Sequence, residues 1–286
     1  MGGTPETTFK PSIFDAGTAA SAHRECSVSI ISVMDSLLKP GRILLAIAIA
    51  CFGLHYLAFA AGLATGAPGP PWFPGPQWVS WAAGIGLLAA GISLLIDQQG
   101  QWAALLLGLA LLLRVLVVHL PRTLANVHDP GPWTSAGEIL SICGGVLVLE
   151  GSWAKGLDGD RLPGSSSTTF FGQYLFAFPL FIFGAQHLIY GQFVVTLVPS
   201  WIPARLFWAY FIGAAFIAAA LAILTRRLGV LAAALLGLMF FLWLLIVHIP
   251  RVVVSPHSAN EWTSTFVALA MSGSALAVAG TLARRE

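Results

Sequence analysis

A polar motif occurs twice in this chain. It reads VVHLPRTLANVHDPGPWTS over residues 117–135 and IVHIPRVVVSPHSANEWTS over residues 246–264. The second copy begins at residue 246 as the first begins at residue 117, and we call this constant spacing between corresponding residues the motif offset. The apolar positions differ between the copies, whereas His119, Pro121, Arg122 and the closing Trp-Thr-Ser are unchanged. We therefore expect the two segments to make the same contacts in two similar units.

The composition is that of a membrane protein. Hydrophobic residues make up 57% of the chain and charged residues 9%, against roughly 25% charged residues in a soluble domain. An apolar run of about 20 residues can cross the bilayer as a helix, because a helix pairs its backbone polar groups internally. The sequence thus predicts an all-α membrane protein with eight transmembrane helices. The eight apolar runs are Ile43–Gly66, Trp78–Ile96, Trp102–Leu120, Ser135–Trp153, Phe170–Val198, Phe207–Leu224, Val230–Ile249 and Ser264–Thr281.

The motif offset relates most of the first half of the chain to the second. Gly144 corresponds to Gly273, and ALLLGL at residues 104–109 is matched by AALLGL at residues 233–238. These matches predict a tandem duplication of a four-span unit. Because each unit has an even number of spans, we expect two parallel-oriented four-helix bundles related by a pseudo-two-fold axis along the membrane normal. The expected parts are a cytoplasmic N-terminal extension (1–41), a first unit (42–153), a cytoplasmic linker (154–168) and a second unit (169–286).

The Lys and Arg residues predict the orientation in the membrane. The N-terminal segment, the even-numbered loops and the C-terminus carry 10 of the 14 Lys and Arg residues, and the opposite side carries Arg122, Arg205 and Arg251. Positive residues are enriched in cytoplasmic loops. We therefore expect a multi-pass protein of the cell (inner) membrane, with both termini in the cytoplasm and the doubled motif on the outer side.

Parts of the sequence resemble a known family. FGAQHLIYGQFVVTLVPSWIP at residues 183–203, FWAYFIG at residues 207–213 and HIPR at residues 248–251 resemble the DoxX-like four-helix membrane proteins. The resemblance covers nearly all of both units and implies a four-helix membrane fold for each. It also implies an association with redox systems, since relatives include membrane subunits associated with thiosulfate:quinone oxidation. Distant four-helix relatives are cargo receptors or sterol-type binders.

The motif has a structural and a functional interpretation. Pro121 disfavours helix at the residue before it, so the third span should end there, with His119 and Arg122 stabilising the negative helix end. Thr134 or Ser135, and Thr263 or Ser264 in the second copy, are natural N-caps for the following span. In the functional interpretation, His beside Arg at the outer surface donates to a quinone carbonyl or holds an anionic head group. The candidate ligand-binding residues are Arg114, His119, Arg122, His128, Glu138, His248, Arg251 and His257.

Two charges inside the first unit have no counterpart in the second. Arg114 lies within the third span and Glu138 within the fourth, whereas Trp243 and Val267 occupy the corresponding positions. A lone charge at membrane depth costs several kcal/mol and is almost always paired. We therefore predict an intramembrane ion pair between Arg114 and Glu138, and expect the first unit to bind any small polar ligand.

Metal and haem sites find little support in the sequence. Cys26, Cys51 and Cys143 have no metal-binding spacing, and no metal ligand is assigned. His55 and His187 lie inside the first and fifth spans, at depths that differ from those of the motif histidines, which disfavours a bis-His haem. A quinone is the cofactor that the polar residues would suit, and no catalytic residue is identified.

These features together predict an accessory subunit of a membrane redox system rather than a stand-alone enzyme. It would hold a quinone-like or amphipathic molecule near the outer leaflet. Its partners would be the lipid bilayer and a membrane or extracytoplasmic redox protein, with no nucleic acid. The alternative is a non-redox carrier or scaffold for lipids or hydrophobic small molecules.

Overall fold

The computed structural model describes residues 13–62, 77–96, 99–153 and 167–283, with side chains from Ser36 onward. All regular secondary structure in these ranges is helical. The long helices are α1 (Ile13–Ala60), α2 (Gln77–Ile96), α3 (Gly100–Arg114), α5 (Pro130–Ser152), α6 (Ser167–Ile189), α8 (Arg205–Thr225), α9 (Gly229–Trp243) and α11 (Ala259–Leu282). The short helices are α4 (Leu120–Ala125), α7 (Gly191–Leu197) and α10 (Ile249–Val254), and the π-helical turns are η1 (Val115–His119) and η2 (Leu244–His248).

Eight helices in the described ranges are long and apolar enough to cross a membrane, as predicted. Six of these spans consist of one α-helix each. The other two, Gly100–Ala125 and Gly229–Val254, each run from an α-helix through a π-turn into a short helix. The length and composition of the helices therefore indicate a multi-pass all-α membrane protein.

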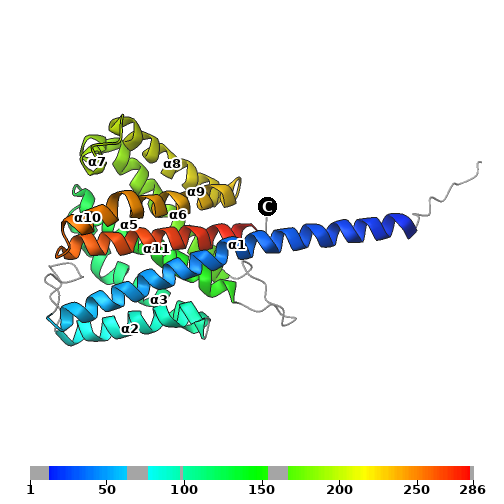
Figure 1. Ribbon diagram of the computed structural model, residues 1–286, viewed down its shortest axis with the longest axis horizontal. Helices are drawn as coiled ribbons and strands as arrows, with labels where there is room; N and C mark the ends of the chain where they lie inside the picture. The colour runs from blue at the N-terminus through cyan, green and yellow to red at the C-terminus, as the bar shows by residue number, and fades with distance from the viewer. Residues whose placement is uncertain (1–12, 63–76, 97–98, 154–166, 284–286) are drawn as a thin grey trace, which may run out of the picture.

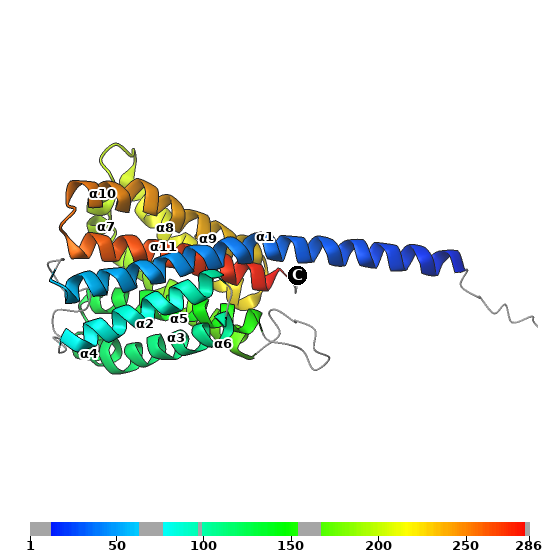
Figure 2. The same cartoon turned by 60° about the horizontal axis from the view of Figure 1, so that its bottom comes forward.

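Some expected boundaries differ from the structure. The run predicted as the fifth span is divided, because Tyr190 leaves the helical backbone between α6 and α7, with φ −105 and ψ 28. The expected N-terminal extension is helical from Ile13, and this part of α1 projects beyond the other helices (Figures 1 and 2). The first twelve residues, the proline-rich loop over 63–76 and the linker residues 154–166 lie outside the described residues.

Pro121 does not end the third span, contrary to the prediction. A proline inside an α-helix lacks an N–H and clashes with the carbonyl of the preceding turn. Here η1 absorbs one extra residue, so the Leu120 N–H donates to the Val115 carbonyl five residues back. In η2, Ile249 donates to Leu244 in the same way. The wider turn accommodates the proline, and the helix continues into α4.

Helices α5 and α11 lie at the centre of the protein. They contact each other, and each also packs against helices of both halves: α5 against α3 and α6, α11 against α9 and α1. Both views show α1 running alongside α11 (Figures 1 and 2). In their most apolar stretches 61% of α5 and 78% of α11 is buried, against 17% of α2. The first helix of each half thus packs on the last helix of the other, and the expected arrangement as two four-helix bundles is not confirmed.

Close glycine contacts hold these cross-half helix pairs together. A Cβ atom added to Gly144 of α5 would lie 2.5 Å from the carbonyl oxygen of Gly172 in α6. A Cβ atom added to Gly273 of α11 would lie 2.7 Å from the carbonyl oxygen of Gly41 in α1. Between membrane helices, such close backbone approach replaces the hydrophobic effect as a source of association. Small residues therefore select which helices become neighbours.

The two halves share element boundaries at the motif offset. The elements α3, η1 and α4 recur at this offset as α9, η2 and α10, with the same lengths. The Cys143 thiol donates to the Gly108 carbonyl oxygen at 3.2 Å, and the Ser272 hydroxyl donates to the Gly237 carbonyl oxygen at 2.8 Å. The same bond at the same offset indicates the same local packing between α3 and α5 as between α9 and α11.

Candidate ligand pocket at the motif end

Each copy of the motif folds into a short helix, a loop and the first turn of a central helix. We call the end of the bundle that carries α4 and α10 the motif end (Figure 2). The Trp133 indole N–H donates to the Val127 carbonyl oxygen at 3.1 Å, and the Trp262 indole N–H donates to the Pro256 carbonyl oxygen at 2.9 Å. The unchanged tryptophans therefore close both loops in the same way, which is a structural role.

The N-caps of the central helices lie earlier than predicted. The Asp129 side chain caps α5 by accepting from a first-turn N–H at 2.9 Å, and the Ser258 hydroxyl caps α11 by accepting from the Glu261 N–H at 3.4 Å. Thr134, predicted as a cap, instead donates to the Gln186 side-chain oxygen of α6 at 2.9 Å. The proline that follows Asp129 is favoured in a first helical turn, so α5 begins before the Trp-Thr-Ser sequence.

A cavity of about 230 Å³ opens at the motif end of the first half. Its walls come from η1, α4, the loop and the first turns of α5. The structure thereby brings together two of the predicted binding residues and adds a hydroxyl group and a carboxylate. The lining residues are His119, Arg122, Asp129, Gly131, Pro132 and Ser135.

His119 is the enclosed polar side chain of this pocket. It is 6% exposed, and its Nε2 atom has no hydrogen-bond partner within the described residues. A buried polar atom left without a partner costs about 1–3 kcal/mol, so a ligand atom that bonds to this nitrogen would recover that free energy. The guanidinium groups of Arg114 and Arg122 both lie within electrostatic range of the ring.

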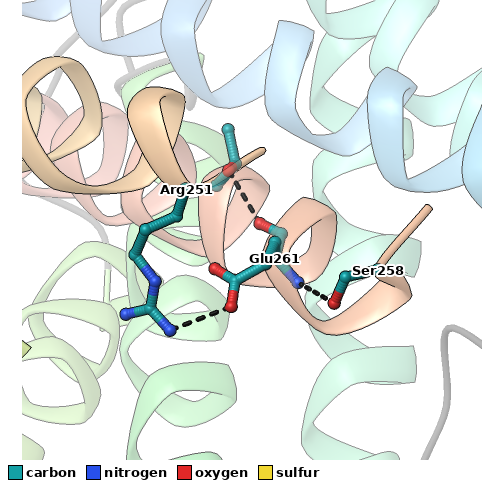
Figure 3. A network of polar contacts seen from close by, with 4 residues as sticks. Arg251, Ser258 and Glu261 are labelled. Carbon is teal, nitrogen blue, oxygen red and sulfur yellow. Dashed lines mark hydrogen bonds and ion pairs between the residues drawn. The ribbon is translucent and has the colours of Figure 1, made fainter. Parts of the chain in front are cut away.

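The corresponding place in the second half holds an ion pair. Arg251 Nη2 lies 2.9 Å from Glu261 Oε1, and the Glu261 backbone N–H donates to the Ser258 hydroxyl (Figure 3). Glu261 is the third residue of α11, as Pro132 is the third residue of α5. The Glu261 carboxylate of the second half therefore corresponds in position to Pro132, which lines the cavity in the first half.

The predicted ion pair between Arg114 and Glu138 is not formed. Arg114 Nη1 donates to the Tyr56 hydroxyl of α1 at 3.1 Å, and no ion pair joins Arg114 to Glu138 in the described residues. α5 faces α3 through Cys143. Glu138 comes five residues earlier and projects about 140° away from that direction at 3.6 residues per turn. The two charges therefore lie on different faces, and no sequence signal identified Tyr56 as the partner of Arg114.

The remaining candidate residues lie outside the cavity. His128 and His257 are exposed in their loops and do not line it. His248 lies at the end of η2 within electrostatic range of Arg251 and Glu261, and its buried Nδ1 has no partner within the described residues. Of the eight candidates, the cavity gathers His119 and Arg122.

Sequence reasoning did not identify Ser135 or Gly131 as pocket residues. Their types are common in loops and first helical turns, so neither position carries a distinctive signal. The mismatch between Pro132 and Glu261 was the available signal, because it breaks a closely matched motif at one charged position. The sequence did not show that Glu261 pairs with Arg251, and this contact is seen in the structure.

In the second half, His187 and Trp243 pack against each other and against a further aromatic side chain. His187 Nδ1 lies 2.8 Å from the Phe183 carbonyl oxygen, and its ring stacks on Trp243 with the centroids 6.4 Å apart. Trp243 also meets Phe216 edge-to-face at 6.1 Å. Trp243, the residue that replaces Arg114 in the second half, thus belongs to an aromatic cluster.

In the described part of the chain, no group of three or more His, Cys, Asp or Glu residues is placed to hold a metal ion. No protein-family model, curated protein or solved structure matches the chain. The pocket at the motif end is therefore the feature from which its function is inferred.

Proposed function

We propose that this protein is an accessory subunit of a membrane redox system and holds the head of a quinone-like or other amphipathic molecule in the motif-end pocket. The carrying observation is His119, which lines the cavity, is 6% exposed and has a buried Nε2 atom with no partner in the described residues. An imidazole nitrogen can exchange a hydrogen bond with a quinone carbonyl or hydroxyl. Arg122 adds a guanidinium group to the same wall.

The size of the cavity favours a head group over a whole ligand. Sites that enclose a drug-sized molecule measure roughly 300–1,000 Å³, whereas this cavity measures about 230 Å³. Nearby, Leu124 of α4 is 61% exposed and Val127 of the loop is 49% exposed. A polar head in the cavity and an apolar tail along the exposed apolar side chains would suit this geometry.

The same geometry supports a second candidate, a non-redox carrier or scaffold for lipids. A phospholipid head group also needs hydrogen-bond donors beside an apolar surface, which the pocket and Leu124 provide. Electron transfer would then play no part. The bound molecule itself distinguishes the two candidates.

Mass spectrometry of an organic extract from gently purified protein tests the proposal. We expect a quinone-like or other amphipathic molecule at near-stoichiometric level, and we expect His119→Leu to deplete it. His128→Ala is the matched control, because His128 lies in the same motif but is exposed and outside the pocket. Bulk phospholipid alone, at the same level in both variants, would contradict the proposal. A specific phospholipid depleted by His119→Leu would favour the lipid scaffold.

The orientation and the duplication are part of the same proposal. The motif end would face the outer side of the cell (inner) membrane, with both termini in the cytoplasm, as the Lys and Arg distribution favours. The halves would be two DoxX-like units related by an approximate two-fold axis between α5 and α11, which contact each other. Impermeant thiol reagents in intact cells should label Val254→Cys but not Arg227→Cys, in a background without the native cysteines. The reverse pattern would contradict this orientation.

A further inference from the structure

The interior of the second half contains a cluster of aromatic rings around Trp243. Phe216 lies 5.4 Å from His187 and 6.1 Å from Trp243, measured between ring centroids. Phe240 lies 5.8 Å from both Phe216 and Trp243, and Phe183 lies 5.7 Å from Phe216. The three phenylalanines are each at most 6% exposed. The side chains of the second half therefore fill its interior at this depth.

The first spans of the two halves are aligned by their glycines. A Cβ atom added to Gly53 would lie 2.8 Å from the Gly84 carbonyl oxygen, and one added to Gly184 would lie 2.8 Å from the Gly213 carbonyl oxygen. Gly84 and Gly213 are related by the motif offset. Gly53 of α1 therefore corresponds to Gly184 of α6, and the residues that follow the two glycines correspond as well.

The first half carries smaller or more polar side chains at the five positions of the aromatic cluster. In chain order these are Phe52, Tyr56, Leu87, Leu111 and Arg114. Two phenylalanines and a tryptophan of the second half are thus replaced by two leucines and an arginine. Phe52, Leu87 and Leu111 are each partly exposed, whereas their three counterparts are buried. The same scaffold is therefore less completely filled in the first half.

Tyr56 and Arg114 provide hydrogen-bond donors at this place. Arg114 Nη1 donates to the Tyr56 hydroxyl at 3.1 Å, and neither side chain makes another hydrogen bond or ion pair with the described residues. Both side chains are partly exposed. A guanidinium group has five N–H donors, and a tyrosine hydroxyl that accepts one hydrogen bond can still donate its own proton. The bond from the guanidinium polarises the Tyr56 O–H and strengthens it as a donor.

The depth of these donors favours a neutral acceptor. Arg114 lies within the span Gly100–Ala125, about 12 Å further from the motif end than Arg122 at 1.5 Å per residue. Polar side chains at membrane depth commonly mark the path or the site of a substrate. A carboxylate or phosphate would lose its hydration on reaching this depth. A carbonyl oxygen on an apolar molecule costs less to bury, and it has two lone pairs that can accept hydrogen bonds.

We propose that Tyr56 and Arg114 bind the carbonyl oxygen of a neutral apolar molecule, the class to which quinones belong, inside the membrane-spanning part of the first half. The Tyr56 O–H and a second N–H of Arg114 donate to the two lone pairs of this oxygen. The apolar body of the molecule lies against Leu87 and Leu111, where the second half has aromatic rings. The site goes beyond the proposed function, because none of these residues lines the motif-end pocket.

Infrared spectroscopy tests the hydrogen bonds directly. The full-length protein in phosphatidylcholine nanodiscs is loaded with an alkyl-1,4-naphthoquinone that carries ¹³C at its carbonyl carbons. We expect the carbonyl stretch of the bound quinone to shift to lower wavenumber, because its oxygen accepts hydrogen bonds. Tyr56→Phe, which keeps the ring and removes the hydroxyl, should abolish this shift. It should also reduce quinone retention in native mass spectrometry by about tenfold, the effect of losing one hydrogen bond.

Matched controls separate the hydroxyl from the tyrosine ring and the carbonyl from the apolar body. Tyr174→Phe in α6 should change neither readout, because Tyr174 is 52% exposed and lies outside the site. An alkylnaphthalene of similar size has no carbonyl oxygen, so wild type and Tyr56→Phe should retain it equally. Circular dichroism establishes that each variant is folded.

A second variant tests the space without removing a donor. Leu111→Phe introduces the residue that the second half carries as Phe240. The larger ring should exclude the naphthoquinone while Tyr56 and Arg114 stay in place. Equal retention of the naphthoquinone by wild type, Tyr56→Phe and Leu111→Phe, or an unshifted carbonyl band in wild type, would overturn the inference. Retention of oleate in preference to the naphthoquinone would also overturn it, because the site would then select an anion.

His119→Leu distinguishes this site from the motif-end pocket. The substitution should deplete a molecule held in the pocket and leave the shifted carbonyl band of the naphthoquinone unchanged. If His119→Leu removes the shifted band and Tyr56→Phe does not, the naphthoquinone is bound in the pocket. The inference is then overturned while the proposed function stands.

Discussion

The Arg251 guanidinium lies 2.9 Å from the Glu261 carboxylate, while Arg122, its counterpart in the first half, lines an open cavity next to Pro132. The surrounding backbone is alike, since the short helices, the π-turns and the tryptophan-closed loops recur at the same offset. The third residue of the central helix therefore differs between two otherwise matching copies, a proline in the first half and a carboxylate in the second.

The Arg251–Glu261 pair should contribute little to the stability of the protein. The Arg251 side chain is 40% exposed, and solvent-accessible ion pairs contribute about 0–1 kcal/mol. A double-mutant cycle of Arg251→Gln and Glu261→Gln, followed by unfolding in mixed micelles, should give a coupling free energy within that range. A coupling of several kcal/mol would show that the pair is shielded from water.

Gly144→Ala and Gly273→Ala should each destabilise the protein by about 1–3 kcal/mol, the cost of overpacking a close contact. The reason is that an added methyl group would meet the backbone of α6 or α1, respectively. Gly86→Ala in α2 is the matched control, because a Cβ atom there meets nothing within 4 Å, and it should be neutral or slightly stabilising. Equal melting temperatures for all three variants would mean that the cross-half contacts are not close.

The π-turn should be required by the proline that follows it. Deleting Val117, whose side chain is 62% exposed, would restore α-helical register and place Pro121 inside a regular helix, at a cost of about 3 kcal/mol. Combining the deletion with Pro121→Ala should recover most of that free energy. Thermal unfolding of the two variants in detergent tests this. If the deletion alone is neutral, the π-turn does not serve to accommodate the proline.

The matched hydrogen bond between α9 and α11 should contribute modestly. Ser272→Ala removes a buried bond of 2.8 Å, and such bonds between membrane helices contribute about 0.6 kcal/mol on average. Ser272→Cys, which introduces the residue found at position 143, should cost less because the thiol can still donate. Ser274→Ala is the control, since its buried hydroxyl has no partner in the described residues. A larger loss for Ser274→Ala than for Ser272→Ala would contradict this assignment.

Several features could be predicted from the sequence because they depend on local properties. Helices of about 20 apolar residues must form in lipid whatever surrounds them, so the eight spans were predictable from composition alone. The motif offset likewise located the two places where α4 and α10 repeat the same turn. The prediction that the third span ends at Pro121 was wrong, because the π-turn η1 accommodates the proline and the helix continues.

The tertiary structure decided everything that depends on which helices become neighbours. The sequence suggested that Arg114 should find Glu138, since both lie at similar depth, yet the rotation of α5 turns Glu138 away and Tyr56 of α1 accepts the bond instead. The duplication did not indicate which helices of the two halves would meet, whereas in the structure close glycine contacts join the first helix of each half to the last helix of the other. Hydropathy determines that a segment crosses the membrane, but it does not specify which face of the helix contacts which neighbouring helix. Neighbours are chosen by the shape of small residues and by a few hydrogen bonds, and these act only once the helices are packed together.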